Sequence, residues 1–458
     1  MDTGDTAWML TSAALVLFMT PGLALFYGGM VRSKSVLNMM MMSLSAMGLI
    51  GVLWVLYGYS IAFGNDVGAG LLGNPGQFLG LQGTFGGTYV GEDGAPADIP
   101  LVGTIPATVF VAFQGMFAII TVALISGAAA DRLRFGPWLL FAGLWATIVY
   151  FPVAHWVFAF DGTTAGEDSK GGWIANTLAA VDFAGGTAVH INAGAAALAL
   201  AIVLGKRRGW PKEPMRPHNL PMVMLGAGIL WLGWFGFNAG SAAGANGVAG
   251  ITFVNTVVAT AAAMLGWLIT ERIRDGKPTS LGAASGIVAG LVAITPSCSA
   301  VDPIGAIIIG VVAGVLCALA VGLKYRLGYD DSLDVVGVHL VGGLVGTILI
   351  GFLATSAAPA GVDGLFYGGG ADQLWRQIVG ALAVTVFSFV VSLIIAYIVK
   401  AITGLRATEE SEIAGIDEGE HAETGYDFSS LRGGGGLNAS SLSAARGSQD
   451  TVTAGKES

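Results

Sequence analysis

Two histidines, His190 and His339, each open an apolar stretch after an Asp- and Gly-containing approach: DFAGGTAVHINAG spans 182–194 and DVVGVHLVGG spans 334–343. Helix continuing from either histidine to the end of its apolar stretch covers about 22–24 Å, less than the ~30 Å of bilayer hydrocarbon, so both imidazoles are expected inside a membrane. Ionisable groups at that depth are costly and mark functional sites. Two adjacent neutral imidazoles can share one proton. The alternative is a pair of packing histidines bonded to backbone.

No third Cys, His, Asp or Glu accompanies the two histidines at that depth, and Cys298 and Cys317 show no metal-ligand spacing, so we expect no metal and no cofactor. Asp182 and Asp334 precede the histidines by eight and five residues. They either attract a cation or stabilise the start of a helix, and the sequence favours the structural role.

Aromatic residues form a second group of candidates, in FVAFQGMF (110–117), AHWVF (154–158) and WLGWFGFNAGS (231–241). Phe113 and Phe117 are four residues apart and share one face of a helix. Aromatic faces attract a desolvated cation by ~2 kcal/mol or more, and Ser241 adds a hydrogen-bond acceptor. The competing interpretation is that these rings only face lipid or fill the core.

The composition requires a membrane around these residues. Of 458 residues, 54% are hydrophobic and 11% are charged, and the mean hydropathy is +0.72. An aqueous surface of this size needs about a quarter of charged residues. The 71 glycines, without a collagen period, suit helices that approach closely in lipid. A net charge of −9 excludes nucleic-acid binding through a basic patch.

Continuous apolar runs of about 20 residues predict an all-α polytopic membrane protein, because transmembrane barrels need short alternating segments. Eleven such runs are present: 8–31, 38–63, 103–130, 137–159, 187–205, 220–241, 250–270, 281–297, 303–323, 335–354 and 375–403.

Lysines and arginines concentrate in alternate loops, as the positive-inside rule requires. One set of loops holds Arg32, Lys34, Arg132, Arg134, Lys206, Arg207, Arg208, Lys212, Arg216, Arg272, Arg274, Lys277, Lys324, Arg326, Lys400 and Arg406. The other set holds only Lys170 and Arg376. Eleven spans with the N-terminus outside and the C-terminus in the cytoplasm account for this split.

The two histidine motifs predict an inverted five-helix repeat. Aligning His190 with His339 also aligns Gly194 with Gly343 and Leu200 with Leu349. Because five spans separate them, the two copies run in opposite directions, about an axis in the membrane plane. We expect spans 1–5 (about 8–205), spans 6–10 (about 220–354) and a peripheral eleventh helix (about 375–403), together a membrane domain over 1–403.

An acidic segment follows, and residues 404–428 predict a cytoplasmic tail that docks through Ile413, Ile416, Tyr426 and Phe428. The Gly- and Ser-rich residues 429–458 predict disorder.

Taken together, these segments resemble the ammonium transporter/methylammonium permease family, relatives of the Rhesus glycoproteins, over residues 8–428. The motifs that carry the resemblance are FYGGMVRSKSVLN (26–38), FQGMFAIITVALISGAAADRLRF (113–135), DFAGGTAVHINAG (182–194), WFGFNAGSA (234–242), DDSLDVVGVHLVGG (330–343) and GLRATEESEIAGIDEGEHAETGY (404–426).

The resemblance implies a homotrimer with one pore per subunit, and it assigns roles to residues that match the family motifs. These are an outer ammonium site of Phe113, Phe117, Phe158 and Ser241; a phenylalanine gate of Phe117 and Phe237; the twin histidines His190 and His339; Asp182 as a structural carboxylate near the pore; and Trp234 as a wall residue. Phe158 stands where the family often has tryptophan, a stronger cation–π partner. A longer insertion, GTTAGEDSKGGW (162–173), follows it.

The resemblance also implies the substrate and partners. We expect ammonium or methylammonium to be recruited outside, deprotonated, and conducted as ammonia past the histidines with coupled proton movement. A PII-type signalling protein is the expected partner of the cytoplasmic tail, and the inner (plasma) membrane of a prokaryote is the expected location. An ammonium-sensing receptor and an intramembrane serine hydrolase using Ser241 and His190 are the alternatives; the hydrolase lacks a recognisable serine motif and oxyanion hole.

Overall fold

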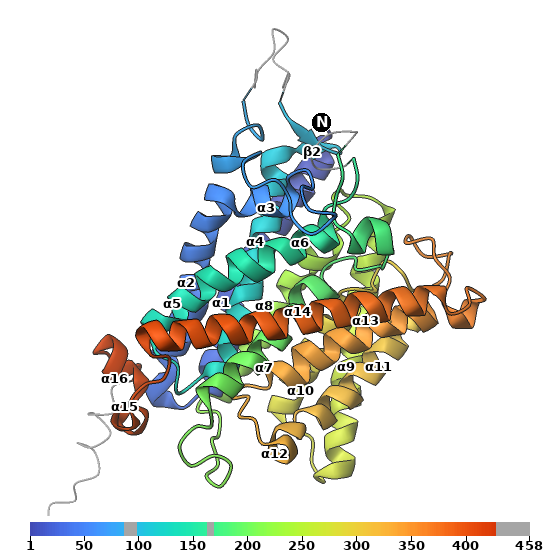
Figure 1. Cartoon of the computed structure of the whole chain (residues 1–458). Helices are drawn as coiled ribbons and strands as arrows, with labels where there is room; N and C mark the ends of the chain where they lie inside the picture. Colours follow the sequence, from blue (N-terminus) through green and yellow to red (C-terminus); the bar gives the residue numbers. More distant parts are fainter. Residues whose placement is uncertain (87–98, 163–168, 427–458) are drawn as a thin grey trace, which may run out of the picture.

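A computed structural model describes residues 1–86, 99–162 and 169–426 (Figure 1). Those residues form a helical protein whose first five spans contain α1 (Thr3–Met30), α2 (Val36–Leu53) with α3 (Tyr59–Phe63), α4 (Ala107–Ile125), α5 (Phe135–Trp145) with α6 (Phe151–Phe158), and α7 (Asn192–Leu204). The next six contain α8 (Leu220–Gly240), α9 (Gly247–Arg274), α10 (Ser280–Ile294), α11 (Pro303–Ala320) with α12 (Leu323–Leu327), α13 (Val341–Leu353) and α14 (Asp372–Thr403).

The expected spans are confirmed as helices. In the described part of the chain, ten helices are long and apolar enough to cross a membrane, and the eighth expected span is the shorter apolar helix α10. The third span begins later than the predicted residue 103, because β1 (Leu101–Val102) and β2 (Ile105–Pro106) form an antiparallel hairpin there. Gly103, with φ of 58°, makes the turn of that hairpin, and a glycine adopts such a φ without strain.

The two halves of the chain pack through the first helix of each, α1 and α8. Glycines bring their backbones together. A Cβ on Gly226 would lie 2.4 Å from the backbone nitrogen of Phe26, and one on Gly236 would lie 2.7 Å from the carbonyl oxygen of Ser12. Small residues are the usual means of close helix packing in lipid, where no hydrophobic effect drives the helices together. The abundance of glycine in the sequence thus finds a structural use.

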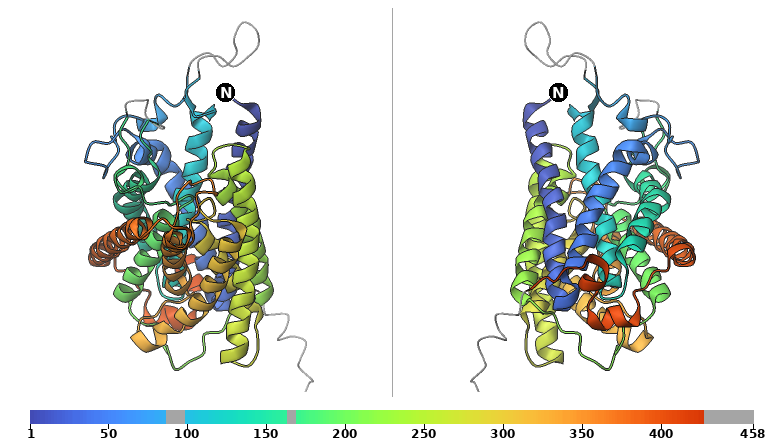
Figure 2. Two further views of the ribbon diagram at one scale, coloured as in Figure 1. Left: turned by 90° about the vertical axis from the view of Figure 1, so that its right-hand side faces the viewer. Right: turned by 90° about the vertical axis from the view of Figure 1, so that its left-hand side faces the viewer.

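The fifth span of each half begins in the same unusual way. Widened π-helical segments, Gly186–Ile191 and Val336–Leu340, lead into α7 and α13, and each contains one of the two histidines. The long helix α14 packs along the outside of α7, α13 and α5, as the views in Figures 1 and 2 show. The eleventh helix is therefore peripheral to the ten that surround the histidines.

The carboxyl-terminal tail folds back onto the membrane helices. Its helix α16 (Ile416–His421) lies beside the start of α2, with Ile416 completely buried, and α15 (Glu409–Ala414) packs against α16. Ile413, which was expected to dock, is exposed instead. Asp417 accepts hydrogen bonds from the backbone nitrogens of Leu37 and Asn38 at 3.0 and 2.8 Å. Phe428 and the segment 429–458 lie outside the described residues.

Candidate functional site

The two histidines meet inside the protein. Their Nδ1 atoms are 3.2 Å apart, and their ring centroids are 5.3 Å apart. Both side chains are buried, which in lipid leaves them no bulk water. When both rings are neutral, each carries one proton. One ring donates its Nδ1–H to the Nδ1 of the other, and the accepting ring carries its own proton on Nε2. His190 Nε2 has no hydrogen-bond partner in the protein, so this nitrogen is free for a small polar molecule.

The space beside the histidines is narrow and apolar. A cavity of about 10 Å³ is lined by both imidazoles together with side chains that include Phe26, Trp234 and Phe237. That volume holds about one molecule of the size of water. A hydrated cation, which carries a shell of several waters, does not fit.

Aromatic rings close this cavity on one side. Phe117 and Phe237 are stacked with centroids 4.0 Å apart and an interplanar angle of 23°, and both are buried. Trp234 stacks on His190 at 5.4 Å and 19°. The indole Nε1 of Trp234 donates to the Thr295 hydroxyl at 2.8 Å, which fixes the plane of the ring. Anything that reaches the histidines from this side must displace the stacked phenylalanines.

A wider chamber of about 340 Å³ lies beyond the stacked pair, and we call it the outer vestibule. Its wall includes all four residues that the family resemblance assigned to an outer site: Phe113, Phe117, Phe158 and Ser241. Phe113 lies 4.9 Å from Phe117, and Phe158 meets Phe117 edge-on at 6.2 Å. The Ser241 hydroxyl donates to the Phe237 carbonyl oxygen at 2.9 Å, which leaves its own oxygen able to accept. Rings and an acceptor around one chamber suit a small cation.

Asp182 holds the first turn of the segment that contains His190. One carboxylate oxygen accepts from the backbone nitrogens of Gly185 and Gly186 at 2.9 and 2.6 Å, and the other accepts from the backbone nitrogen of Thr187 at 2.8 Å. The Thr187 hydroxyl donates to the same oxygen. The side chain is placed to satisfy the unpaired donors of a helix start.

In the second half of the molecule the residue that corresponds to Asp182 is Asp331. The expectation that Asp334 stabilises the start of this helix is wrong. Asp331 accepts from the backbone nitrogens of Val335 and Val336 at 3.1 and 2.7 Å. Asp334 instead pairs with Lys324 at 2.6 Å. A sequence signal for the correct pairing exists, because Asp182 and Asp331 each precede their histidine by eight residues.

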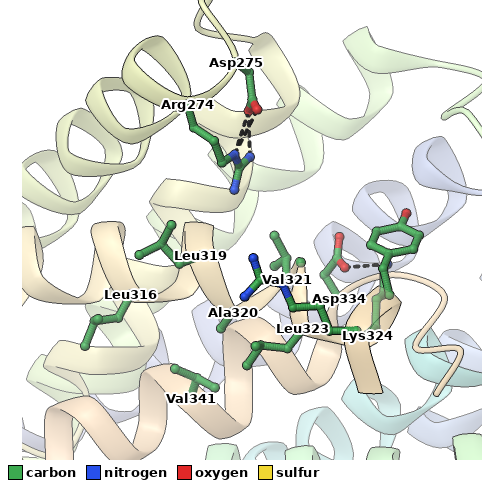
Figure 3. A pocket seen from close by; sticks show the side chains of 13 residues that line it. Arg274, Asp275, Leu316, Leu319, Ala320, Val321, Leu323, Lys324, Asp334 and Val341 are labelled. Atoms are coloured by element: carbon green, nitrogen blue, oxygen red, sulfur yellow. Dashed lines mark hydrogen bonds and ion pairs between the residues drawn. The ribbon is translucent and has the colours of Figure 1, made fainter. Parts of the chain in front are cut away.

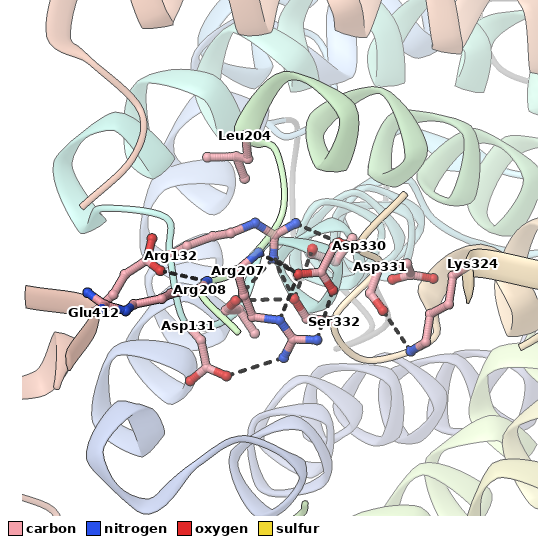
Figure 4. Close-up of polar contacts among 12 residues, drawn as sticks. Asp131, Arg132, Leu204, Arg207, Arg208, Lys324, Asp330, Asp331, Ser332 and Glu412 are labelled. Atoms are coloured by element: carbon pink, nitrogen blue, oxygen red, sulfur yellow. Dashed lines mark hydrogen bonds and ion pairs between the residues drawn. The ribbon is translucent and has the colours of Figure 1, made fainter. Parts of the chain in front are cut away.

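A buried ionic cluster joins the loops at the end of the molecule where the tail lies (Figure 4). Arg207 pairs with Asp330 at 2.9 Å and with Asp131 at 3.3 Å, and Arg132 donates to the Asp330 carbonyl oxygen at 2.6 Å. Burial lowers the pKa of Arg132 to about 10 although Asp330 opposes the shift. Burial alone would raise the pKa of Asp330, but the hydrogen bond and charge of Arg207 bring it below its usual value.

Two further acids belong to this end of the molecule. Burial raises the pKa of Asp331 to about 6, against the attraction of Lys324. Glu412 of the tail accepts from Arg406 Nε at 2.5 Å and from the backbone nitrogen of Arg208 at 3.3 Å. The tail is therefore bonded to the same loop that contributes Arg207 to the cluster.

Another cleft, of about 810 Å³, contains neither histidine (Figure 3). Its polar groups include the ion pairs Arg274–Asp275 and Lys324–Asp334, and the leucines of α11 line its apolar side. Because this cleft includes neither a histidine nor any of the residues that line the outer vestibule, we place the candidate site at the small histidine cavity and the outer vestibule. Sequence analysis missed Thr295 and Asp331 there; Thr295 had no recognisable signal.

Comparison with known proteins identifies relatives of the chain. Residues 7–426 match the model of the Ammonium Transporter Family. A protein of Mycobacterium tuberculosis H37Rv named "Ammonium transporter" is 71% identical over 94% of this chain and 92% of its own length, and one of Bacillus subtilis is 49% identical over 94% and 100%.

Solved structures are also similar. Mep2 of Saccharomyces cerevisiae matches with a TM-score of 0.79 at 34% identity, over 90% of this chain and 88% of its own. A structure described as "Sensor Amt Protein" matches with a TM-score of 0.80 at 27% identity, over 91% of this chain and 98% of its own.

Proposed function

The chain belongs to the ammonium transporter family, a family of membrane transporters and not of enzymes, and from this premise we propose how it moves its substrate. Ammonium enters the outer vestibule, where Phe113, Phe117, Phe158 and Ser241 bind it. It gives up a proton near the gate formed by Phe117 and Phe237. Ammonia then passes the two histidines and takes up a proton on the other side.

The observation that carries this proposal is the contact between His190 and His339 at 3.2 Å beside a cavity that holds about one small molecule. Moving a bare ion into such an apolar space forfeits hydration worth many kcal/mol, whereas neutral ammonia loses far less. Because the ammonium ion does not enter this cavity, its proton must travel separately from ammonia. The hydrogen-bonded histidine pair offers a route for that proton. We therefore infer that a proton moves with each ammonia and that transport is electrogenic.

Purified protein in proteoliposomes tests this mechanism. An ammonium gradient is expected to produce a current and a flux of methylammonium, both abolished when His190 and His339 are replaced together by alanine. His155→Gln is the matched control, because His155 is also buried but is bonded to Ala62 and Asp66 and lies outside the lining of the histidine cavity. A double variant with native methylammonium flux would refute the role of the pair; flux without current would refute the coupled proton.

We propose that the protein lies in a plasma membrane with the orientation that the charge pattern predicts. The outer vestibule then faces the outside of the cell, and the tail lies in the cytoplasm. We also propose a homotrimer, because the family resemblance implies one. The tail over residues 404–426 is proposed as the contact for a PII-type protein. The membrane unit over 1–403 with its two halves is proposed as the transport domain.

A sensing role is the second candidate, since one structural neighbour is described as a sensor. A receptor would change its conformation when ammonium binds but would not transport the substrate. The proteoliposome experiment separates the two, because a receptor that does not transport gives neither current nor methylammonium uptake.

A further inference from the structure

The wall of the outer vestibule contains a carboxylate, Asp5, beside the aromatic rings and Ser241. Asp5 comes from the first turns of α1, and its oxygens are turned toward two other segments. Oδ2 accepts from the Thr104 hydroxyl at 2.6 Å, and Oδ1 accepts from the backbone nitrogen of Ala245 at 2.8 Å. The side chain thus joins α1, the β1–β2 hairpin and the loop between α8 and α9 at the rim of the chamber.

Both partners of this carboxylate are neutral. In the described residues, no lysine, arginine or histidine forms an ion pair with Asp5. Two other described acids of this end of the molecule differ: Asp66 faces His155 at 3.4 Å, and Asp161 faces Lys170 at 3.9 Å. A carboxylate has about four acceptor positions, of which the two neutral donors occupy only two. Asp5 therefore keeps its full negative charge and free acceptor capacity at the rim.

The other groups of the vestibule attract a cation only through partial charges. Phenyl rings act through their quadrupole at short range, and Ser241 offers a hydroxyl oxygen. A full charge acts over a longer distance and raises the local concentration of counter-ions in a cleft with apolar walls. Its effect weakens with salt over a Debye length of about 10 Å at 0.1 M ionic strength.

From this geometry we propose that Asp5 is a specificity-determining residue that concentrates small monovalent ammonium cations in the outer vestibule, ahead of the aromatic site. The inference rests on the proposed function, since it assigns Asp5 to the recruitment of the same substrate. It also predicts that the vestibule distinguishes the protonated cation from the neutral amine before any proton is lost.

The test is methylammonium uptake by proteoliposomes at pH 7, measured as KM and kcat at ionic strengths from about 10 to 300 mM. Asp5→Asn preserves the size of the side chain and an acceptor oxygen. It is expected to raise KM about two- to fivefold at low ionic strength with little change in kcat, and the difference is expected to disappear at high salt. Asp363→Asn is the matched control, because Asp363 also accepts from a backbone N–H, that of Ser356, but lies outside the lining of the vestibule.

Thr104→Val separates charge from architecture, because it removes the hydrogen bond to Asp5 and keeps the carboxylate. It should retain the salt dependence of the wild type. If Asp5→Asn keeps the wild-type dependence of KM on salt, or if Asp363→Asn loses it equally, Asp5 does not recruit the cation and this inference is wrong. If the wild-type protein transports no methylammonium, the proposed function fails instead.

Discussion

Replacing Asp182 by alanine distinguishes a structural carboxylate from a ligand of the substrate. The side chain accepts from four backbone N–H groups, of Gly185, Gly186, Thr187 and Ala188, at 2.6–3.3 Å. It is buried, with 7% of the residue exposed. Leaving a buried donor unpaired costs about 1–3 kcal/mol, so four donors give a loss of about 4–12 kcal/mol. Water that enters the site can bond to some of these donors, so the lower half of that range is expected.

Such a loss is a large share of the stability of a folded protein. We expect Asp182→Ala to lower the unfolding temperature of the purified protein by roughly 5 °C or more, as followed by intrinsic fluorescence in detergent. Asp182→Asn retains one amide oxygen for Gly185 and Gly186 and loses the acceptor for Thr187, so its loss of stability should be intermediate.

Flux in proteoliposomes completes this experiment. In the structural interpretation, the fraction of Asp182→Asn protein that remains folded binds methylammonium with a native KM. A variant with native unfolding temperature and a KM raised tenfold or more would refute that interpretation and would make Asp182 a direct ligand of the cation. The matched comparison is Asp331→Asn, which alters the corresponding cap in the second half of the molecule.

Three further outcomes are expected. Phe158→Trp should lower the KM for methylammonium a few-fold, because indole is the stronger cation–π partner; an unchanged or higher KM would contradict the assignment of Phe158 to the outer site. The pKa of Asp331 is raised to about 6 in the folded state, so on acidification the folded state binds a proton at a higher pH than the unfolded state does. The free energy of unfolding of the wild type should therefore rise relative to that of Asp331→Asn as the pH falls from about 6 to 4. Unfolding temperatures measured at several pH values test this. Truncation after Ala401 removes the buried Ile416 and the tail's bonds to the loops, and it should reduce flux and abolish PII binding in a pull-down; native values of both would exclude a regulatory tail.

The sequence predicts the membrane helices well because each span must supply about 20 apolar residues whatever its neighbours are. The bounds of the helices are predicted less well, because hydropathy does not report local backbone geometry. Gly103 turns a hairpin before α4, and α10 ends at Ile294, three residues before the end of the predicted run. The inverted repeat is also visible in the sequence, because both halves retain an aspartate, a glycine-rich approach and a histidine.

Details of the site depend on contacts between segments far apart in the chain, which a single sequence does not contain. Thr295 supports Trp234 across 61 residues, and Asp5 reaches the loop at Ala245 across 240. From the sequence, Asp334 and not Asp331 was considered as the acid before His339. A positive φ of 64° at Asp334 turns the chain there, and Asp331 caps the helix instead. Spacing compared between the repeats was the better guide.

The two capped helix starts bear on the proposed passage of neutral ammonia in place of the ammonium ion. Helix N-termini carry a partial positive charge of about half an elementary charge, and both histidine-bearing segments begin near the histidine cavity. That charge would repel a cation from either side, but Asp182 and Asp331 bond directly to the exposed N–H groups and offset it. The described residues that line the histidine cavity include no carboxylate that could replace the hydration of an ion. In the mechanism that we propose, the selection between ammonium and ammonia in this cavity follows from desolvation, and the histidines provide the route for the proton.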